Sequence, residues 1–480
     1  MNRERAEAHL RLLAEAELRR VPVSPVDGAV SYRLGLVTQA LRSVGAIDDD
    51  TGELIQAELE LALAMRPGGA PRPGPGWPSP AAVVQDRMDR LARLRSARSA
   101  REVPVSAASA GPAGSWRLIP VGRMIQIPEA ELLLLTYVQT AAGARFTTAT
   151  GPSSSSGPRG SGGMCGSSRR QLYRFAAADD LGTTYQLSGR TGSPAGLLEV
   201  QPDPPEAIRW LDLTPVPGEP AIRVDLARPD PGGSVPAITV TRKAASAGEI
   251  LLDVIAAQLL TVAVTFRRDT AKQRAAARRE LLWLAGEDKL GDIITALQAA
   301  DALPAASPVP GQLARLCARL GISGHGITAP AADGVPEPWE SMLTRYRRPE
   351  PGPALAPGRW ASPVGELPGQ DGTRIAVLDV HHGESGTIVY LLVSDVTAED
   401  DWPYGRMVRP LPALWIRDSS DRWHTTRIRG TGRPGVHGEC VLWLAVTPAL
   451  DRGSTWIDVV ATGQSAEARA TVPLRGWGPC

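Results

Sequence analysis

The chain carries the same short pattern twice, in two regions rich in β-forming residues. Val200-Gln201-Pro202 is followed by Trp210-Leu211-Asp212-Leu213, and Val446-Thr447-Pro448 is followed at identical spacing by Trp456-Ile457-Asp458-Val459. Each pattern combines apolar alternation with a proline before it, which is typical of a β-strand entered from a turn. The recurrence at fixed spacing predicts two diverged copies of one structural unit.

A second stretch supports the repeat. The run from Asp180 to Gly189 aligns without a gap with the run from Asp421 to Gly430, which pairs the two aspartates and the two closing glycines. In the Trp-x-Asp element we expect Trp210 and Trp456 to fill the core while the aspartate that follows points to solvent. The shared part of the two copies therefore specifies fold.

The strand pattern of both copies consists of short apolar runs separated by Gly, Pro and Asp clusters. A succession of such strands over roughly 110 residues is typical of an immunoglobulin-like sandwich. The predicted fold class is α+β multidomain, with two immunoglobulin-like antiparallel β-sandwiches separated by a helical domain and preceded by a small helical N-terminal domain.

The domain boundaries follow from changes in periodicity and from Pro/Gly-rich runs, since a chain of 480 residues is too long for one core. The predicted parts are a helical N-terminal module (1–66), a Pro/Gly-rich linker with a short basic helix (67–115), sandwich copy 1 (116–242) with a flexible Gly/Ser loop (151–168), a helical spacer (243–348), a Pro-rich linker (349–363) and sandwich copy 2 (364–480). Capping-box patterns predict helix starts at Asp50-Glu53 and at Ser246-Glu249.

The composition favours a soluble cytoplasmic protein. The formal charge is +1, from 52 basic and 51 acidic residues, so no large net field attracts nucleic acid or membrane. Lys243, Lys272 and Lys289 are the only lysines, and this arginine excess reflects a GC-rich coding sequence, as in a high-GC bacterium. The apolar run Ile250–Phe266 is shorter than the roughly 20 residues that span a bilayer. Four scattered cysteines predict free thiols in a reducing compartment.

The sequence contains only weak matches to motifs of cofactor-binding, metal-binding or catalytic sites. Gly430-x-Gly432-x-x-Gly435 matches a dinucleotide-binding pattern, but a strand rather than a helix is expected after it. His381, His382 and Glu384 form one cluster of metal-ligand types, and His437, Glu439 and Cys440 form another. We interpret the first cluster as surface histidines of a hairpin turn and predict no metal and no cofactor. Paired acids such as Asp179-Asp180 are interpreted as turn residues.

The candidate binding residues are two tryptophans and three arginines. Trp402 and Trp423 fall in predicted turns, so their rings could be exposed for a partner. Arg267, Arg268 and Arg278 lie on a basic helix that could contact phosphate or an acidic partner. A second basic helix, Arg87–Arg98, has the same character. No aromatic residues interleave with the arginines, which makes nucleic acid a less favoured partner.

The leading hypothesis is a non-enzymatic protein-interaction or scaffold protein with one or more protein partners and no membrane span. Two alternatives stay open. One is a regulator that contacts nucleic acid through the basic helices. The other is an enzyme with its site at the junction of the helical spacer and a sandwich, using His325 in the turn Gly321–Gly326.

Overall fold

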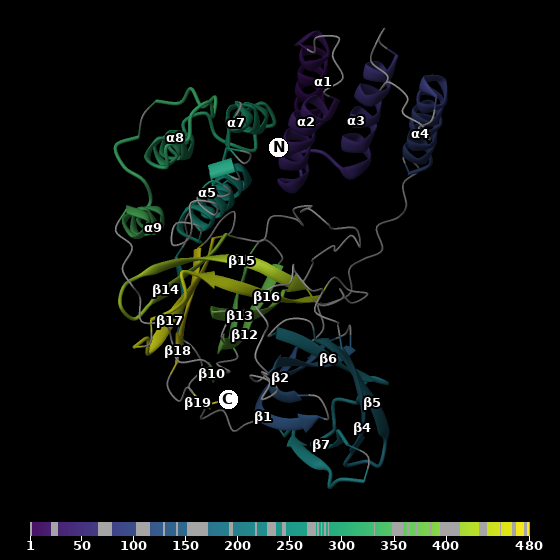
Figure 1. Ribbon diagram of the computed structural model, residues 1–480, viewed down its shortest axis with the longest axis vertical. Coiled ribbons are helices and arrows are strands. Elements are labelled where there is room, and N and C mark those ends of the chain that lie inside the picture. The colour runs from purple at the N-terminus through teal and green to yellow at the C-terminus, as the bar shows by residue number, and fades with distance from the viewer. Residues whose placement is uncertain are drawn as a thin grey trace. The chain divides into compact units, whose positions relative to one another are not determined.

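The structure is a computed structural model that describes residues 2–20, 27–65, 79–101, 116–127, 130–140, 143–150, 171–191, 195–216, 218–227, 237–241, 246–265, 275, 278–279, 281–282, 285–286, 288–330, 332–347, 359–361, 365–370, 373–383, 386–393, 413–431, 439–451, 453–462, 467–474 and 478–479. Contacts divide the chain into two compact units. The first is Met1–Pro112 with Ala245–Trp339 and Glu399–Ala413; the second is Ala113–Ala244 with Glu340–Ala398 and Leu414–Cys480. Helices dominate the first unit and both β-sheets lie in the second (Figure 1).

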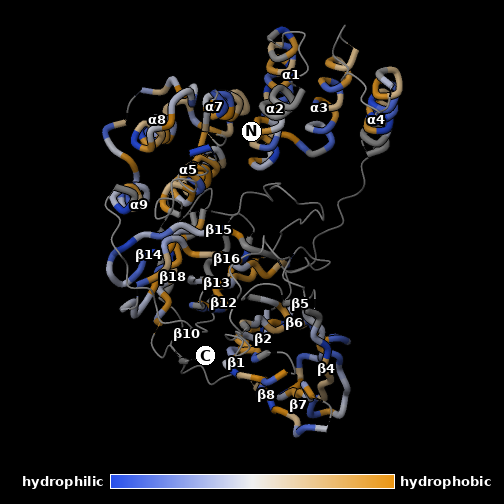
Figure 2. The backbone as a smooth tube through the Cα atoms, in the orientation of Figure 1, coloured by the Kyte–Doolittle hydropathy of each residue, from blue (hydrophilic) through white to orange (hydrophobic). Residues whose placement is uncertain are grey.

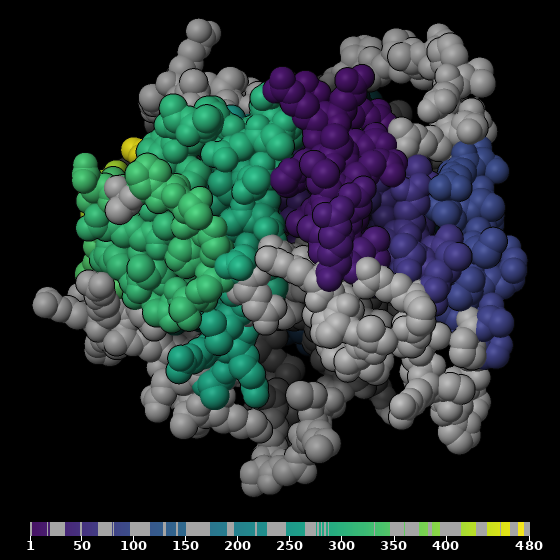
Figure 3. Space-filling view, turned by 90° about the horizontal axis from the view of Figure 1, so that it is seen from above, coloured from purple at the N-terminus to yellow at the C-terminus, as the bar shows by residue number. Residues whose placement is uncertain are grey.

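Four helices open the first unit: α1 (Arg3–Arg20), α2 (Asp27–Ser43), α3 (Asp49–Ala64) and α4 (Pro80–Arg101). α3 contacts α1, α2 and α4, and both α1 and α2 contact α7 (Lys289–Ala299). Figure 3 shows the purple N-terminal helices between the blue α4 and the green segment that contains α8. The side chain of Asp48 accepts a hydrogen bond from the Thr51 N–H, so α3 begins two residues before the predicted start at Asp50.

Helix α5 (Ala247–Thr265) is the apolar centre of the other half of this unit (Figure 2). Its predicted capping box is confirmed: Ser246 N–H donates to Glu249 Oε2 at 2.7 Å, and Glu249 N–H donates to Ser246 Oγ at 3.2 Å. Among the described residues, α5 alone is long and apolar enough to cross a membrane, but 61% of its window Ala247–Val264 is buried in the protein. Burial on several sides is what a helix in a protein core requires.

Among the described residues, three further helices with defined bounds follow α5. α7 and α8 (Val309–Arg319) belong to the first unit, while α9 (Glu337–Arg347) begins there and continues into the second. At the start of α9, Trp339 is 1% exposed and its Nε1–H donates to Asp253 Oδ1 of α5 at 2.7 Å. This bond satisfies the polar atom of a large buried side chain.

The second unit contains two antiparallel sheets, one curved into a near-barrel and the other into a half-barrel. One has eight strands in the order β1-β2-β3-β6-β5-β4-β7-β8. Their bounds are β1 Arg117–Ile127, β2 Ala130–Thr140, β3 Gly143–Thr150, β4 Gln171–Asp179, β5 Thr184–Thr191, β6 Ala195–Gln201, β7 Trp210–Thr214 and β8 Ile222–Asp225. β1 contacts β8, and Arg117 joins the two ends of the sheet by donating to the main-chain oxygens of Glu206, Ile208 and Leu226.

The other sheet follows the order β19-β10-β12-β13-β16-β15-β14-β17-β18-β9, with β11 also paired to β12. Its strands are β9 Ala237–Thr241, β10 Arg359–Ala361, β11 Gly365–Gln370, β12 Thr373–Gly383, β13 Gly386–Val393, β14 Ala413–Asp418, β15 Trp423–Thr431, β16 Cys440–Thr447, β17 Trp456–Thr462, β18 Glu467–Pro473 and β19 Gly478–Pro479. From β12 to β18 the order reproduces that of β2 to β8, so the predicted repeat is present in the strand order of both sheets.

The proline element occupies the same place in both sheets. Gln201-Pro202 and Thr447-Pro448 are both cis peptide bonds, and each directly follows the equivalent strand, β6 or β16. The Trp-x-Asp strands β7 and β17 then occupy the same place in the two sheet orders.

The upstream alignment needs a correction of two residues. Asp179, not Asp180, occupies the turn position of Asp418: Asp179 Oδ1 accepts from the Leu181 and Thr183 N–H groups, as Asp418 Oδ1 does from those of Ser420 and Arg422. Gly182 (φ 83) and Asp421 (φ 64) are the matching left-handed residues.

The expectation for the two tryptophans was wrong. Leu211 and Leu213 are fully buried, whereas Trp210 is half-buried on the opposite face, where the Arg223 guanidinium lies 4.6 Å from its ring centroid. Arg223 also donates two hydrogen bonds of 2.8 Å to Asp212. Residues two apart share a face, so Trp and Asp of this element lie on the same side of the strand.

The two sheets pack against each other through one shared apolar core within the second unit. Its fully or nearly fully buried members are Leu133, Leu135, Val138 and Ala149 from the first sheet and Ala376, Leu378, Ile388, Tyr390, Leu392 and Val441 from the second. At one edge of this core, Trp116 Nε1–H donates to Glu439 Oε1 at 2.7 Å and Arg374 lies over the Trp116 ring at 3.9 Å.

A polar cluster lies inside this core, where both sheets have a bulge. The pairing of β2 with β3 shifts between Leu134 and Tyr137, and that of β12 with β13 shifts between Val377 and Asp379. Asp379 is fully buried and accepts from Thr136 Oγ1 (2.7 Å) and Thr147 Oγ1 (2.6 Å). Thr147 Oγ1 in turn accepts from the Thr136 N–H at the bulge, so a side chain binds this main-chain donor.

These observations support the α+β class and correct several details. The immunoglobulin-like sandwich is not confirmed, since each copy follows one continuous strand order. β9, which the sequence placed in copy 1, pairs with β18 of the second sheet. β10 lies inside the predicted Pro-rich linker. Residues 67–78 and 102–115 of the first predicted linker and the Gly/Ser loop at 151–168 lie outside the described residues.

Candidate functional site

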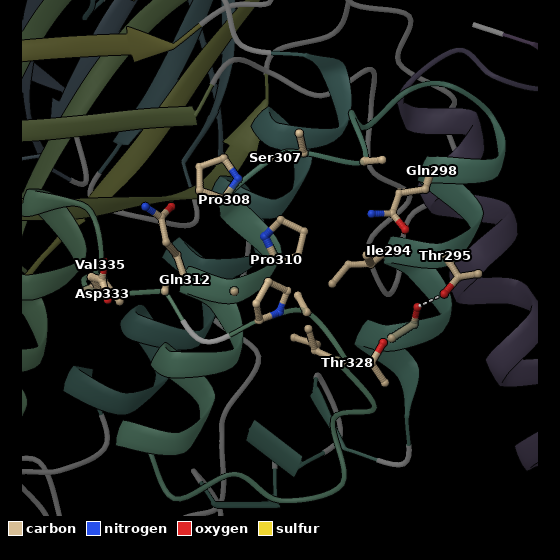
Figure 4. Close-up of a pocket in the computed structure, with 18 of the residues that line it drawn as sticks. Ile294, Thr295, Gln298, Ser307, Pro308, Pro310, Gln312, Thr328, Asp333 and Val335 are labelled. Atoms are coloured by element: carbon tan, nitrogen blue, oxygen red, sulfur yellow. Dashed lines mark hydrogen bonds between the residues drawn. The ribbon is translucent and has the colours of Figure 1, made fainter.

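The candidate site is a groove of about 710 Å³ in the helical unit (Figure 4). One side is formed by α7, which contributes Ile294, Thr295 and Gln298. The other is formed by the connection before α8 and by its first turn, including Ser307, Pro308, Pro310 and Gln312. The remaining wall is the segment 326–336, which contains no helix or strand among its described residues.

Two helix glycines allow this wall to lie directly on the helices. A Cβ atom at Gly291 would lie 2.2 Å from Gly326 O, and one at Gly311 would lie 2.3 Å from Pro330 O. Both distances are shorter than any tolerated contact, so only glycine fits at these two positions. Arg315 of α8 adds a hydrogen bond of 2.6 Å from Nη1 to Ala332 O. The groove is therefore a preformed feature of the fold.

The lining is polar and almost uncharged. Gln298 and Gln312 are half-buried on opposite sides, while Thr295 and Thr328 are exposed (Figure 4). The Thr295 hydroxyl donates to Gly291 O at 2.8 Å, and the Ser307 hydroxyl donates to Glu249 Oε1 at 2.6 Å. Asp333 is the one ionisable residue among the described residues that line the groove. Carboxamides and hydroxyls both donate and accept, so the groove can bind neutral polar groups.

His325, the histidine of the enzyme hypothesis, lies next to this wall. Its main-chain oxygen accepts from the Gly291 N–H at 3.0 Å, and its Nδ1 accepts from the Ile327 N–H at 3.1 Å. The ring is half-buried and fixes the turn that leads into the groove wall. These contacts give His325 a structural task in positioning residues 326–336.

The predicted tryptophan sites divide into one described and one undescribed residue. Trp402 lies outside the described residues. Trp423 is the first residue of β15 and only 4% exposed, so its ring is not presented to solvent as expected for a turn tryptophan. Its main-chain groups contact α9, since Ser341 Oγ accepts from the Trp423 N–H and Arg345 donates to Trp423 O.

The basic residues also differ in their surroundings. Arg267 and Arg268 lie outside the described residues, and Arg278 is exposed in a helical segment. On α4, arginines face the acidic side chains of α3: Arg90 pairs with Glu60 (3.2 Å), Arg95 pairs with Glu58 (3.0 Å), and Arg87 donates to Glu60 O. These arginines hold α4 on α3, in addition to the apolar contact of Leu91 with Leu54 and Ala57.

The expectation of surface histidines at the β12 turn was wrong. His381 and His382 belong to β12 and are 2% and 3% exposed. Burial, and then the neighbouring His382, lowers the pKa of His381 to about 4. Glu384 and His437 lie outside the described residues. In the described part of the chain, no group of three or more His, Cys, Asp and Glu side chains is placed to hold a metal ion.

A second buried histidine serves the repeated turn of the second sheet. His424 Nδ1 lies 2.7 Å from Pro448 O, and its Nε2 lies 3.2 Å from Asp418 Oδ2. Burial lowers the pKa of His424, against the opposing effect of Asp418. Burial would raise the pKa of Asp418, but the His424 bond and the N–H groups of the turn hold it below its usual value. Tyr185 takes the place of His424 in the first sheet, with its hydroxyl 2.5 Å from Asp179.

Among the described cysteines, Cys317 and Cys440 are buried free thiols. Burial raises the pKa of Cys317 to about 12, so this thiol stays protonated and unreactive at neutral pH. The groove residues Gln298 and Gln312 were missed by the sequence analysis, because glutamines beside Pro- and Gly-rich segments carry no motif. No protein-family model matches the chain, and the comparisons with curated proteins and with solved structures gave no match either.

Proposed function

We propose that this chain is a non-enzymatic interaction protein, and that the groove between α7, α8 and residues 326–336 binds a short, extended and uncharged peptide segment of a protein partner. The groove itself carries the proposal: it is open, preformed and lined by groups that suit main-chain amides. Its volume of about 710 Å³ is within the usual range of ligand-binding clefts.

The lining chemistry supports a neutral ligand. Gln298 and Gln312 face the groove from opposite sides and can each donate to and accept from a peptide group (Figure 4). No lysine, arginine or histidine is among the described lining residues, so a phosphate or carboxylate would find no cationic partner there. The exposed prolines Pro308 and Pro330 and the half-buried Ile327 add apolar surface for small side chains.

The rigidity of the wall supports affinity. Residues 326–336 are held by the close approach at Gly291 and Gly311 and by the Arg315 bond to Ala332 O. A preformed wall does not have to be ordered when the ligand binds, which lowers the entropic cost of association. The paired β-sheets of the other unit then form a rigid scaffold within the same chain.

The test uses the full-length chain and a library of uncharged ten-residue peptides rich in Ala, Pro, Ser and Thr. Peptides that bind in the screen are measured by isothermal titration calorimetry. Gln312→Ala and Gln298→Ala should each weaken binding about fivefold to tenfold, since each removes hydrogen bonds worth roughly 1 kcal/mol. Gln186→Ala, at an exposed position of β5, is the matched control and should bind like the wild type. A library without binders, or binders that ignore both groove substitutions, would refute the proposal.

A further inference from the structure

The same turn occurs once in each sheet, and in the second sheet a helix packs against it whereas in the first sheet its surface is exposed. In the second sheet the turn Asp418–Arg422 leads into Trp423, and in the first sheet the turn Asp179–Thr183 leads into Thr184. The main-chain bonds match, since Asp179 N–H donates to Thr183 O (3.0 Å) and Asp418 N–H donates to Arg422 O (2.9 Å). The two turns therefore present the same backbone to their surroundings.

That backbone leaves one donor and one acceptor pointing away from the hairpin. With the bond from residue 179 to residue 183, Ala178 and Thr184 form a non-hydrogen-bonded pair, so the N–H and C=O of Thr184 point away from β4. The next strand on that side, β6, pairs with β5 only from Gln186 onward. The same reasoning applies to Trp423 in the second sheet, where β16 begins to pair at Thr425.

In the second sheet a helix binds these two groups. Ser341 Oγ of α9 accepts from the Trp423 N–H at 3.4 Å, and Arg345 Nη1 donates to Trp423 O at 3.0 Å. Ser341 and Arg345 are four residues apart and thus share one face of α9. Met342 and Leu343, between them in sequence, are fully buried.

In the first sheet the corresponding surface is open. Thr183 and Thr184 are exposed, and Leu181 is 62% exposed, in place of the exposed but polar Ser420. Asp180, which is half-buried beside them, takes the place of Ser419. Its Oδ1 accepts from the Arg209 N–H at 2.9 Å, and its carboxylate adds negative charge to this surface. This surface combines an apolar contact, a main-chain donor and acceptor, and negative charge.

We infer that residues 180–184 form a docking surface for an amphipathic helix of a partner protein, which carries a hydroxyl residue and an arginine four positions apart. The hydroxyl accepts from the Thr184 N–H, the arginine donates to Thr184 O and meets Asp180, and an apolar residue between them covers Leu181. The partner helix thus repeats on the first sheet what α9 does on the second. This surface is independent of the groove in the helical unit.

The probe is a helix-stabilised peptide with the sequence of residues 337–347, titrated against the full-length chain by fluorescence anisotropy. We expect saturable binding that is at least about tenfold weaker in Leu181→Asp and in Thr184→Pro, which removes the N–H group. Ile428→Asp, at an apolar position of β15 that is 42% exposed, is the matched control and should leave binding unchanged. A peptide with alanine at the positions of Ser341 and Arg345 should also bind at least about tenfold more weakly.

Three results would overturn the inference. No saturation up to about 1 mM peptide would mean that the surface does not bind such a helix. Binding that Leu181→Asp leaves unchanged would place the peptide elsewhere, including on the second sheet in competition with α9. Equal binding of the alanine peptide would remove the hydroxyl and the arginine from recognition. Leu181→Asp is at an exposed site, so it reports on docking even if Thr184→Pro impairs folding.

Discussion

Thr136 Oγ1 donates a hydrogen bond of 2.7 Å to Asp379 Oδ1, and these two residues occupy the same position in the two copies of the repeat. Tyr137 pairs with Phe146, and Val380 pairs with Val389, so the residue before each lies at the same bulge of β2 and β12. Equivalent residues that contact each other are the mark of an isologous interface. The second unit is thus a fused pair of copies that pack as the subunits of a symmetric dimer would.

Asp379→Ala should destabilise the second unit by about 2–4 kcal/mol, because it removes the carboxylate that accepts from the buried hydroxyls of Thr136 and Thr147. Urea unfolding followed by tryptophan fluorescence measures the change. Glu219→Ala, at an exposed turn position of the same unit, should stay within about 0.5 kcal/mol of the wild type. An Asp379→Ala chain as stable as this control would show that the cluster does not hold the sheets together.

His381 makes the second unit sensitive to acid. Its neighbours across the strands, Ile388 and Trp360, both pack in the shared core, and the equivalent residue of the first sheet is Val138. Burial lowers the pKa of His381 from 6.5 to about 4, so the unfolded chain takes up a proton before the folded one does. The stability that the neutral, buried His381 gives the folded unit is therefore fully present above pH 6.5, and it is lost as the pH falls from 6.5 toward 4.

His381→Val should weaken this loss, since valine does not titrate. The free energy of unfolding of the variant minus that of the wild type should be about 2 kcal/mol more favourable at pH 5 than at pH 8. The measurement is the free energy of urea unfolding at both pH values. An unchanged pH dependence in His381→Val would contradict a neutral, buried His381.

The sequence predicted the strands of the Trp-x-Asp elements and the capping box at Ser246 because these depend on neighbouring residues. It could not predict the shared core of the two sheets, since Leu135 and Leu378 are far apart in sequence and come together only in the folded unit. The buried Trp423 was expected at the surface because its turn position is visible in the sequence, whereas the contact of α9 with its backbone arises only in the folded chain. Gln298 and Gln312 line opposite sides of one groove only because α7 and α8 belong to the same folded unit.

Arg117 closes the first sheet, so Arg117→Ala should open it. Its guanidinium donates to three main-chain oxygens at 2.6–2.7 Å, which joins β1 to the ends of β7 and β8. The substitution removes the charged donor from three main-chain carbonyl groups, so we expect the free energy of unfolding to fall by about 2–3 kcal/mol. Hydrogen exchange should increase in β1 and β8. Arg174→Ala, on the exposed side of β4, should change neither quantity, and equal behaviour of the two variants would refute the closing role.

The groove wall depends on two glycines. Gly291→Ala and Gly311→Ala should each destabilise the helical unit by about 1–3 kcal/mol and abolish peptide binding, because the new Cβ would displace the wall from its helix. Alanine at a helix position is normally favourable by about 1 kcal/mol, so the direction of the effect is diagnostic. Gly334→Ala, in the same wall but with open space around its Cα, should be tolerated. Thermal unfolding and peptide titration report the two effects.

The most direct test of the fused pair is a double-mutant cycle between Thr136 and Asp379 in the full-length chain. Urea unfolding of Thr136→Val, Asp379→Ala and the double variant gives the coupling between the two residues, with Thr136→Val and Glu219→Ala as an uncoupled pair. A coupling of about 1–3 kcal/mol is predicted, because the residues share a buried bond across the interface. Additive effects within about 0.5 kcal/mol, as expected for the control pair, would contradict the contact between equivalent positions on which the account rests.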